Sequence, residues 1–384
     1  MKILFDATAM ALTGYHKGGA YRYGMELLRR LPSAAPQDWE IVLYFNFTRL
    51  RHRPKMEETC KLAGISKRMV SHVPPQLLQA LRVPVECTAG SHDLFHGPFD
   101  LVPRTRRSAR VVTIHDLAFL RAPEGLPAAW IADRQRTVPP SARRSHRIIT
   151  VSEFSRRDIV ERLSIPEDRV VAIHHGIGTE FTPATDLAAD HARLERRYEI
   201  RPGFLLYLGT LQPNKNIEGL CAAFQILRRE GFTGQLVLAG AQGWLFDEMW
   251  ARIIARGDDS GVLRTGFVDE DDIPRLYRSC QAFALVSFLE GFGIPVLEAM
   301  ACGAPVVAAD ACSLPEVAGD AGILVDPRNA EAIAVGLRAA VTPSAARSAR
   351  IARGLAWAAR FTWDRSAAAH ARVYREAAAE AATE

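Results

Sequence analysis

Two glutamates eight residues apart, Glu290 and Glu298, enclose the stretch of the chain with the clearest chemical character. The loop between them contains Gly291 and Gly293, and a residue without a side chain lets a ligand approach the backbone closely. A helix is predicted to begin at Pro295, and a helix start offers unpaired N–H groups and a positive dipole end that favour a phosphate. Each carboxylate can accept hydrogen bonds from two sugar hydroxyls. The residue types therefore indicate a nucleotide-sugar site.

The predicted helix continues through an apolar run, residues 296–302, and ends before Gly303. Pro305 forbids its continuation, and residues 306–309 form a predicted buried strand. Because the helix is apolar nearly all round, it should be buried. A carboxylate in its first turn is then out of place unless it has a function. The alternative interpretation is that Glu298 only interacts with the helix dipole and that Glu290 is a surface acid.

The run E-G-F-G-I-P-V-L-E from Glu290 to Glu298 resembles the E-x7-E signature of the retaining glycosyltransferases of family 4. The similarity continues through residues 313–317 and 322–327. It implies an α/β GT-B fold, with two doubly wound Rossmann-like domains that face a deep inter-domain cleft. It also implies that Glu290 holds the donor sugar and Glu298 the nucleotide ribose. The donor-binding residues that lie between them are Gly291, Phe292, Gly293 and Ile294.

Lys215 stands in a turn after a predicted strand, residues 204–208, and just before a predicted helix. A cation in that position can pair with a diphosphate, and the resemblance implies that Lys215 clamps the leaving group. Family members often carry arginine where this chain has Thr210 and Asn214, so the second phosphate-binding cation is unassigned. The G-T-L-x-P-x-K-N run resembles a subgroup rich in mannosyltransferases, which points to GDP-mannose. A merely solvated lysine is the alternative.

His115 follows a predicted strand, residues 111–114, and the carboxyl end of a strand is where ligands bind in open α/β sheets. A histidine there has a near-neutral pKa and can donate or accept a proton. The resemblance implies that His115 contacts the donor sugar near the reacting carbon, and the alternative is a structural histidine. Asp116 is interpreted as scaffold. The predicted catalytic set is His115, Lys215 and Glu290.

Other loops complete the donor site by resemblance. The glycine-containing loop after the first strand is expected to face the phosphates and the acceptor, with Arg22 near it. Loops after later strands are expected to frame the phosphates and the base. A plain glycine pair is the alternative for the first loop. The residues predicted in this way are Gly18, Gly19, Gly209, Gly240, Phe267 and Val268.

Composition indicates a soluble globular protein, with 48% hydrophobic and 24% charged residues among 384. No apolar run approaches the roughly 18–20 residues of a membrane span. Six cysteines without C-x-x-C spacing indicate neither a zinc site nor a disulfide framework. The adjacent His174 and His175 should point to opposite sides of a strand and so cannot share a metal. With no D-x-D motif, neither a metal nor a cofactor is expected beyond the nucleotide-sugar co-substrate.

The predicted domains are residues 1–180, on the acceptor side, and 181–362, which bind the nucleotide sugar; a last helix, 363–384, is expected to pack back on the first domain. Strands are predicted at 41–45 and 93–96, with a variable acceptor-facing region between them. Residues 1–180 carry 27 Lys and Arg against 18 Asp and Glu (+9), and the remainder carries 21 against 25 (−4). The basic half can attract phosphates or an anionic membrane face, or be merely solvated; no motif supports nucleic acid.

The combined prediction is a retaining, metal-independent hexosyltransferase. It moves a sugar, mannose from GDP-mannose as the first choice, to a glycan or lipid-linked acceptor in cell-surface polysaccharide synthesis. The expected location is the cytoplasm, with peripheral attachment to the inner face of the membrane. The alternatives are a UDP-sugar transferase of glucosyl or GlcNAc type, a nucleotide-sugar epimerase, and a non-catalytic GT-B protein.

Overall fold

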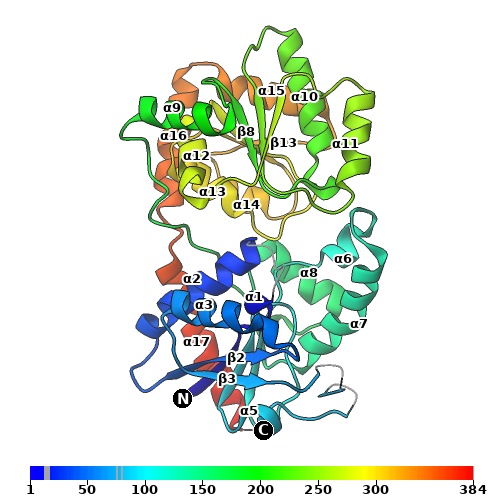
Figure 1. The fold of residues 1–384 in the computed structure, drawn as a ribbon, viewed down its shortest axis with the longest axis vertical. Coiled ribbons are helices and arrows are strands. Elements are labelled where there is room, and N and C mark those ends of the chain that lie inside the picture. Colours follow the sequence, from blue (N-terminus) through cyan, green and yellow to red (C-terminus); the bar gives the residue numbers. More distant parts are fainter. Residues whose placement is uncertain (13–17, 75–76, 79–80, 384) are drawn as a thin grey trace. The chain divides into compact units, whose positions relative to one another are not determined.

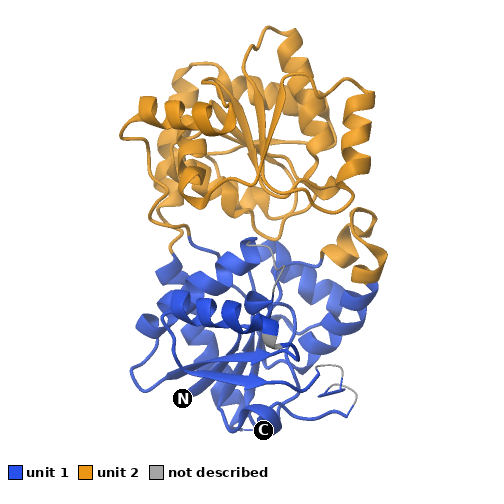
Figure 2. Ribbon diagram, viewed as in Figure 1, with its two compact units in different colours: residues 1–117, 132–176, 363–384 blue, residues 118–131, 177–362 orange. Residues whose placement is uncertain are grey.

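A computed structural model describes residues 1–12, 18–74, 77–78 and 81–383 of the chain. Contacts between residues divide the protein into two compact units (Figure 2). Unit 1 comprises residues 1–117, 132–176 and 363–384, and unit 2 comprises residues 118–131 and 177–362. That residues 1–180 and 181–362 form the acceptor-side and nucleotide-sugar domains stays a prediction.

Unit 1 contains a seven-stranded parallel sheet with the strand order β3-β2-β1-β4-β5-β6-β7. Most strand residues are buried, and most of the buried ones are aliphatic or aromatic, as expected of strands covered on both faces. The strands are β1 (Lys2–Asp6), β2 (Glu40–Asn46), β3 (Arg68–Ser71), β4 (Leu94–Gly97), β5 (Ala109–Thr113), β6 (Arg147–Thr150) and β7 (Val170–Ala172).

Helices lie on both sides of this sheet (Figure 1). The C-terminal helix α17 packs against α2 and β5, so the end of the chain contributes to the core of unit 1. The helices of the first half of the chain and the last helix are α1 (Thr8–Ala11), α2 (Gly19–Ala34), α3 (Arg53–Ala63), α5 (Glu86–Ala89), α6 (Ala118–Arg121), α7 (Ala128–Arg144), α8 (Glu153–Leu163) and α17 (Trp363–Ala381), with the 3-10 turns η1 (Leu50–His52), η2 (Pro123–Gly125) and η3 (Glu167–Arg169).

Unit 2 contains a six-stranded parallel sheet with the order β10-β9-β8-β11-β12-β13. Its central strands are again almost wholly buried. The strands are β8 (Leu205–Leu208), β9 (Leu236–Ala239), β10 (Val262–Gly266), β11 (Ala282–Leu285), β12 (Val306–Ala309) and β13 (Ile323–Val325).

The helices of unit 2 also cover both faces of its sheet (Figure 1). The helices within residues 177–362 are α9 (Leu187–Tyr198), α10 (Ile217–Arg229), α11 (Phe246–Ala255), α12 (Ile273–Ser279), α13 (Ile294–Ala301), α14 (Leu314–Ala318), α15 (Ala330–Val341) and α16 (Ala345–Ala358), with the 3-10 turns η4 (Pro213–Lys215) and η5 (Glu270–Asp272). Alternating strands and helices around parallel sheets confirm the predicted α/β class.

The strand order reverses once in each sheet, between β1 and β4 in unit 1 and between β8 and β11 in unit 2. At such a reversal the connections leave toward opposite faces of the sheet and open a crevice at the carboxyl ends of the strands. Ligands of open α/β sheets bind there. In unit 2 the crevice lies beyond Leu208 and Leu285, and Lys215 and Glu290 follow shortly after these strand ends.

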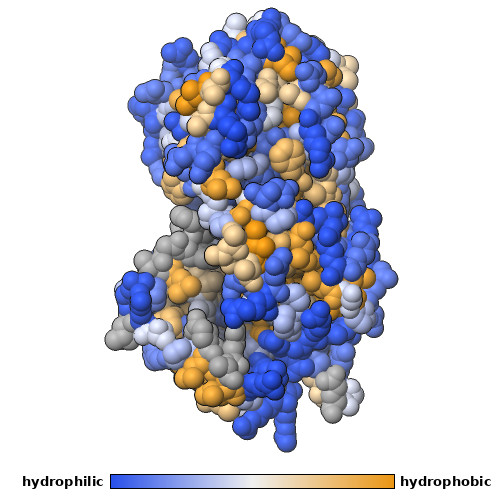
Figure 3. All heavy atoms as spheres, turned by 90° about the vertical axis from the view of Figure 1, so that its right-hand side faces the viewer, coloured by the Kyte–Doolittle hydropathy of each residue, from blue (hydrophilic) through white to orange (hydrophobic). Residues whose placement is uncertain are grey.

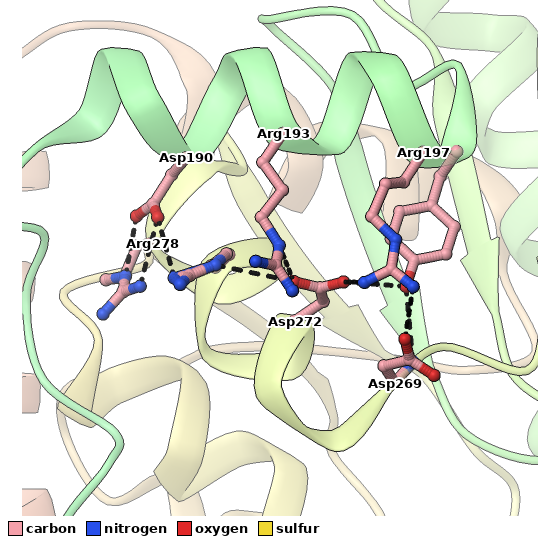
Figure 4. Close-up of polar contacts among 8 residues, drawn as sticks. Asp190, Arg193, Arg197, Asp269, Asp272 and Arg278 are labelled. Atoms are coloured by element: carbon pink, nitrogen blue, oxygen red, sulfur yellow. Dashed lines mark hydrogen bonds and ion pairs between the residues drawn. The ribbon is translucent and has the colours of Figure 1, made fainter.

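An ion-pair network joins α9 to α12 and the turn before it (Figure 4). Asp272 is 0% exposed and accepts hydrogen bonds from Arg193 Nε at 2.5 Å and Arg197 at 2.7 Å. At the other end of the network, Asp190 lies 2.9 Å from Arg278 Nε. Burying a carboxylate is costly unless it is paired, and here two guanidinium groups surround it. The network therefore fixes the first helix after residue 177 to the rest of unit 2.

The space-filling view shows a largely hydrophilic surface with smaller hydrophobic groups between the charged ones (Figure 3). Among the described residues, no helix has the length and apolar character needed to cross a bilayer.

Candidate functional site

The turn that carries Lys215 is fixed by the residue that follows it. Asn216 has a left-handed backbone (φ 54°), a conformation that asparagine tolerates better than most residues. Its side chain accepts a hydrogen bond from Gly219 N and caps α10, while its Nδ2 donates to Val286 O at 3.0 Å and Pro327 O at 2.6 Å. Asn216 thus ties the Lys215 turn to the carboxyl end of β11.

Lys215 and Glu290 form an ion pair at this end of the sheet. Lys215 Nζ donates to Glu290 Oε1 at 2.8 Å, and Ser287 Oγ donates to the same oxygen at 2.8 Å. The two charged side chains remain 20% and 13% exposed, so both are accessible to a ligand. Because both donors occupy Oε1, Oε2 faces no hydrogen-bond donor within the described part of the chain. A sugar hydroxyl can bind there.

Gly293 starts helix α13 with φ 104°, a backbone region that favours glycine. A Cβ atom at this position would lie 2.6 Å from Leu314 Cδ2, so no larger residue fits without rearrangement. Ser313 Oγ donates to the backbone oxygens of Glu290 and Phe292, both at 2.9 Å, and so holds the loop against α14. The helix begins at Ile294, one residue earlier than predicted, because Gly293 supplies the turn into it.

Glu298 lies within α13 and is only 1% exposed. The hydroxyl of Tyr277, itself fully buried, donates to Glu298 Oε2 at 3.0 Å. The prediction that this helix is buried is confirmed. Gly291, Phe292 and Ile294 are buried as well, so their expected contribution to a ligand is made through the backbone.

A row of glycines follows the three strands on the other side of the crevice. Gly240, after β9, has φ 141°, and a Cβ atom on it would lie 2.1 Å from Gly209 O, so only glycine allows this approach of two backbones. Gly240 N donates in turn to Gly266 O at 2.9 Å. Beyond Gly266, Phe267 is 68% exposed whereas Val268 is 5% exposed. The Phe267 ring is thus available for stacking, and the Val268 side chain belongs to the core.

One signal in the sequence was not used in predicting the site. Lys215 is the only lysine after residue 67, in a stretch of the chain whose other fixed cations are all arginine. A lysine ammonium is a compact point charge on a flexible stem, which suits a partner that changes position during a reaction. The roles of Asn216 and Ser287 were missed because their partners lie far along the chain or depend on the loop conformation.

In unit 1, His115 lies directly beyond β5 and is half-buried. His115 Nε2 is 3.1 Å from Pro98 O. A carbonyl oxygen only accepts, so Nε2 carries a proton, and Nδ1 is the ring nitrogen that remains for a ligand. The ring meets the edge of Tyr23, with centroids 5.0 Å apart and planes at 86°. These contacts fix the orientation of a group that can accept a hydrogen bond from a hydroxyl.

A chain of buried neutral groups lies behind His115. His370 Nδ1 is 2.8 Å from Ser366 O and must donate to it, so His370 Nε2 accepts from the Tyr23 hydroxyl at 2.8 Å. Tyr23 then accepts from Thr113 Oγ1, also at 2.8 Å. Because the backbone carbonyl at Ser366 can only accept, it determines the direction of every proton in the chain.

The same chain continues to His96. Thr113 Oγ1 accepts from His96 Nε2 at 2.8 Å, and His96 Nδ1 accepts from the hydroxyl of Tyr374 at 2.6 Å. Burial lowers the pKa of His370 to about 4 and holds the pKa of His96 well below its usual range. Both rings are therefore neutral at pH 7, as the direction of the hydrogen bonds requires.

Gly18 precedes α2 and Gly19 begins it, and a Cβ atom on either would meet no described atom within 4 Å. Nothing in the fold of the described residues therefore requires glycine at these two positions. The structure brings Lys215, Ser287 and Glu290 together, whereas His115, Gly18 and Gly19 belong to unit 1. That all of them meet one donor stays a prediction.

The paired histidines lie beyond the end of β7 rather than on a strand, and their side chains differ in exposure. His174 is exposed, whereas His175 is buried and packs against Tyr23 and Trp363. Burial, together with the neighbouring His115, holds the pKa of His175 well below its usual range. No group of three or more His, Cys, Asp or Glu side chains is placed to hold a metal ion among the residues that the structure describes.

Two family models match the chain, one for each half. The model described as glycosyltransferase family 4 matches residues 17–181, and the model described as glycosyl transferases group 1 matches residues 194–355. The chain is 32% identical over 315 residues to O-antigen chain mannosyltransferase B of Escherichia coli, covering 79% of this chain and 81% of that protein. It is also 34% identical over 167 residues to the serotype-specific mannosyltransferase WbdA of Escherichia coli, which corresponds to 42% of this chain and 20% of WbdA.

The fold is also similar to solved glycosyltransferase structures. Anabaena HepE, crystallised in complex with UDP and glucose, superposes with a TM-score of 0.73 at 19% identity over the full length of both chains. At that identity the similarity concerns the fold alone. The E-x7-E stretch, the two parallel sheets and the two family matches all indicate the same family. The chain belongs to the family 4 glycosyltransferases, a family of retaining enzymes with the GT-B fold.

Proposed function

We propose that this glycosyltransferase moves a mannosyl residue from GDP-mannose to a glycan or lipid-linked acceptor during cell-surface polysaccharide synthesis. The similarity to two mannosyltransferases, one of them an O-antigen chain enzyme matched over 79% of this chain, supports the choice of sugar. The observation that carries the proposal is the Lys215–Glu290 pair, 2.8 Å apart beside the start of α13.

In the proposed reaction the bond between the sugar C1 and the diphosphate breaks while C1 bonds to an acceptor oxygen on the same face. Negative charge grows on the departing diphosphate. Lys215 and the positive end of the α13 dipole stabilise that charge, and a preorganised cation of this kind acts more strongly on the transition state than on the bound donor. The acceptor proton leaves with the diphosphate oxygen, so no separate base is required.

Glu290 and Glu298 have different proposed tasks. Glu290 Oε2 accepts a hydroxyl of the donor sugar, while Ser287 and Lys215 hold Oε1. Glu298, buried and bonded to Tyr277, accepts from the ribose. His115 Nδ1 accepts from a sugar hydroxyl near C1, because His115 Nε2 is already committed to Pro98 O. Phe267, with its ring exposed, stacks on the base.

The donor is tested by incubating the protein with GDP-, UDP- and ADP-sugars and following thermal unfolding and sugar transfer. A ligand at 100 times its Kd stabilises the folded protein by about 2.7 kcal/mol, which is measurable as a rise in Tm. The proposal requires GDP-mannose to raise Tm most. A larger rise with UDP-glucose or UDP-N-acetylglucosamine contradicts the mannosyl assignment. Turnover of the donor to an epimeric nucleotide sugar without an acceptor contradicts transfer itself.

The proposed location is the cytoplasmic face of the membrane, where a lipid-linked acceptor is presented. The excess of basic residues in the first half of the chain supports it, because anionic lipids attract basic surfaces by roughly 1 kcal/mol per residue.

A further inference from the structure

Eight arginines gather where strands β5, β6 and β7 of unit 1 begin. Four lie on the segment that enters β5, three around the junction of α7 and β6, and one on the turn that enters β7. All these connections reach the amino ends of parallel strands, so they meet at one edge of the sheet. We call this surface the basic face; it comprises Arg104, Arg106, Arg107, Arg110, Arg143, Arg144, Arg147 and Arg169.

The guanidinium groups of this face are held mainly by neutral oxygens. Arg110 Nε donates to Arg144 O at 2.5 Å, and Arg144 donates to Val102 O at 3.0 Å. Arg169 donates to Arg143 O at 3.0 Å and to Ser145 O. A carbonyl oxygen orients a guanidinium without neutralising its charge. The pKa of Arg144 is lowered by burial and by its neighbours Arg104 and Arg110, so like charges crowd together here.

The basic face also has carboxylates beside it. Glu167 and Asp168 directly precede Arg169 in η3, and Glu167 pairs with Arg156. Glu380, on α17, pairs with Arg147. Glu86 accepts the backbone N–H groups of Arg106 and Arg107, so it fixes the loop and leaves the two side chains free of that bond. Five of the arginines, Arg104, Arg106, Arg107, Arg143 and Arg144, form no ion pair with any residue that the structure describes.

The arginines of the network between α9 and α12 are paired differently. In the network of Figure 4, Arg193 and Arg197 share Asp272, and Arg278 pairs with Asp190. In that network the positive charge is matched locally by acids. On the basic face, five arginines have no ion pair among the described residues, so positive charge is retained there.

An exposed leucine lies beside this charge. Leu81 is 64% exposed and is followed by the exposed Arg82. Four residues after Leu81, Val85 N donates to Arg104 O at 2.9 Å, which joins this segment to the basic face. An apolar side chain next to arginines suits a bilayer interface, where the cations meet lipid headgroups and the leucine meets the acyl boundary.

We propose that the basic face, with Leu81 at its margin, docks unit 1 on an anionic lipid surface. The proposal names the surface responsible for the membrane location proposed above. It has its own test, because lipid binding is measured without any sugar donor. Nucleic acid fits the exposed leucine poorly, and an acidic protein or a second copy of the chain is an outcome of the test.

A consequence follows for the acceptor. Strand β5 runs from the basic face to His115, so the lipid would contact the end of the unit 1 sheet opposite to that histidine. Five strand residues at about 3.3 Å each separate the two ends by roughly 17 Å. A lipid-linked acceptor must extend at least that far from the membrane, which favours a glycan chain already several sugars long.

The test is co-flotation of the full-length protein with phosphatidylcholine vesicles and with vesicles that contain phosphatidylglycerol. The variant R104Q/R106Q/R107Q removes three charges from the basic face. R196Q/R201Q/R229Q removes three exposed charges from unit 2 as a matched control. We expect binding only to the anionic vesicles, on the order of 100-fold weaker for the first variant and unchanged for the control. Binding should also weaken with salt, and L81S should weaken it at every salt concentration.

Equal binding to neutral and anionic vesicles, or equal loss in both triple variants, would overturn the proposal. So would a wild-type protein that ignores vesicles and instead forms a dimer that R104Q/R106Q/R107Q abolishes. Transfer to a water-soluble acceptor, measured on the same preparations, should be unchanged by these substitutions. If transfer is absent while vesicle binding behaves as expected, the proposed function is wrong, whereas the proposed docking of the basic face on lipid is supported.

Discussion

At the carboxyl end of the unit 2 sheet, the polar groups are charged and partly exposed, with Lys215 and Glu290 paired at the mouth of the crevice. At the same end of the unit 1 sheet, the groups behind His115 are neutral and fully buried, and they bond in one direction from Tyr374 to Ser366. A charged pair that faces solvent can exchange partners when a ligand arrives. A buried neutral chain cannot, because any group that loses its partner remains unpaired.

This difference separates what substitutions should do in the two units. In unit 2, removal of Lys215 should impair the reaction more than it reduces stability, since its ion pair with Glu290 lies at a surface that solvent reaches. In unit 1, removal of a chain member should reduce stability first. Each prediction below tests one side of this contrast.

The largest effect is expected at Lys215. Lys215→Ala should lower kcat by roughly 10²–10³, or about 3–4 kcal/mol of transition-state stabilisation, because the leaving diphosphate loses its cation. Its Tm should stay within a few degrees of the parent, since the side chain is 20% exposed and lies outside the core. Steady-state kinetics and thermal melts measure both. Lys67→Ala, which breaks an exposed pair with Glu40, is the matched control. A kcat within a few-fold of the parent would refute the clamp.

The next largest effect is expected in unit 1, on stability. Tyr23→Phe leaves His370 Nε2 without a donor and the Thr113 hydroxyl without an acceptor, both in a buried environment. We expect a loss of about 2–3 kcal/mol in the free energy of unfolding. Tyr374→Phe, at the end of the chain, removes only the bond to His96 and should cost less. Urea denaturation of the two variants compares them. Equal losses, or none, would show that the chain does not act as one unit.

Stability should also depend on pH because of the same groups. The pKa of His370 is about 4 in the folded protein, below the value near 6.5 of an unfolded histidine. Between these values the unfolded state binds more protons, so stability is complete above pH 6.5 and declines as the pH falls toward 4. From pH 7 to pH 5 this histidine alone accounts for roughly 2 kcal/mol. The buried His96 and His175 act in the same direction.

Urea denaturation at pH 7 and pH 5 measures this decline in the free energy of unfolding. In His370→Gln the decline should be smaller by the contribution of that one histidine. A stability that is flat between pH 7 and pH 5 would mean that the pKa values of these histidines are the same in the folded and the unfolded protein, which would contradict the prediction.

The donor loop of unit 2 was largely predictable because its signals are local. Glycine, proline and an apolar run fix a loop, a helix and a strand within residues 290–309, and the structure has α13 and β12 there. Strand β3 was not predicted, since only one of its four side chains is buried and the pattern is faint. The family resemblance supplied the roles of Lys215, Glu290 and Glu298, which spacing alone does not give.

The buried chain of unit 1 was not predictable from local patterns. Tyr23 and His370 are 347 residues apart in the sequence, and Tyr374 and His96 are 278 apart. Neither pair produces a local pattern, because a histidine within a helix has the same sequence appearance whether it is buried or solvated. The basic face was visible only as an excess of charge, and its place at one sheet edge required the strand order.

A smaller effect is expected at Glu298. Glu298→Gln keeps one acceptor but removes the negative charge that we propose binds the ribose in both the ground state and the transition state. The KM for the donor should therefore rise several-fold, more than kcat falls. Tyr277→Phe, which removes the hydroxyl that donates to Glu298 Oε2, is the companion variant and should raise KM less. A fall in kcat without a change in KM would place Glu298 in the chemical step, contrary to the proposed role.

The smallest effect is expected from chelation. A divalent metal that bridges a diphosphate is usually held by protein carboxylates and keeps several waters, and Glu290, the carboxylate at the crevice mouth, is already paired with Lys215. The charge of the leaving group is then neutralised by Lys215 and by the start of α13, neither of which EDTA removes. We therefore expect transfer to be nearly unchanged by excess EDTA. A metal-dependent transferase assayed in the same buffer provides the control. Loss of activity that Mn²⁺ or Mg²⁺ restores would show that the cation at Lys215 is insufficient, and that the unassigned second phosphate ligand is a metal rather than an arginine.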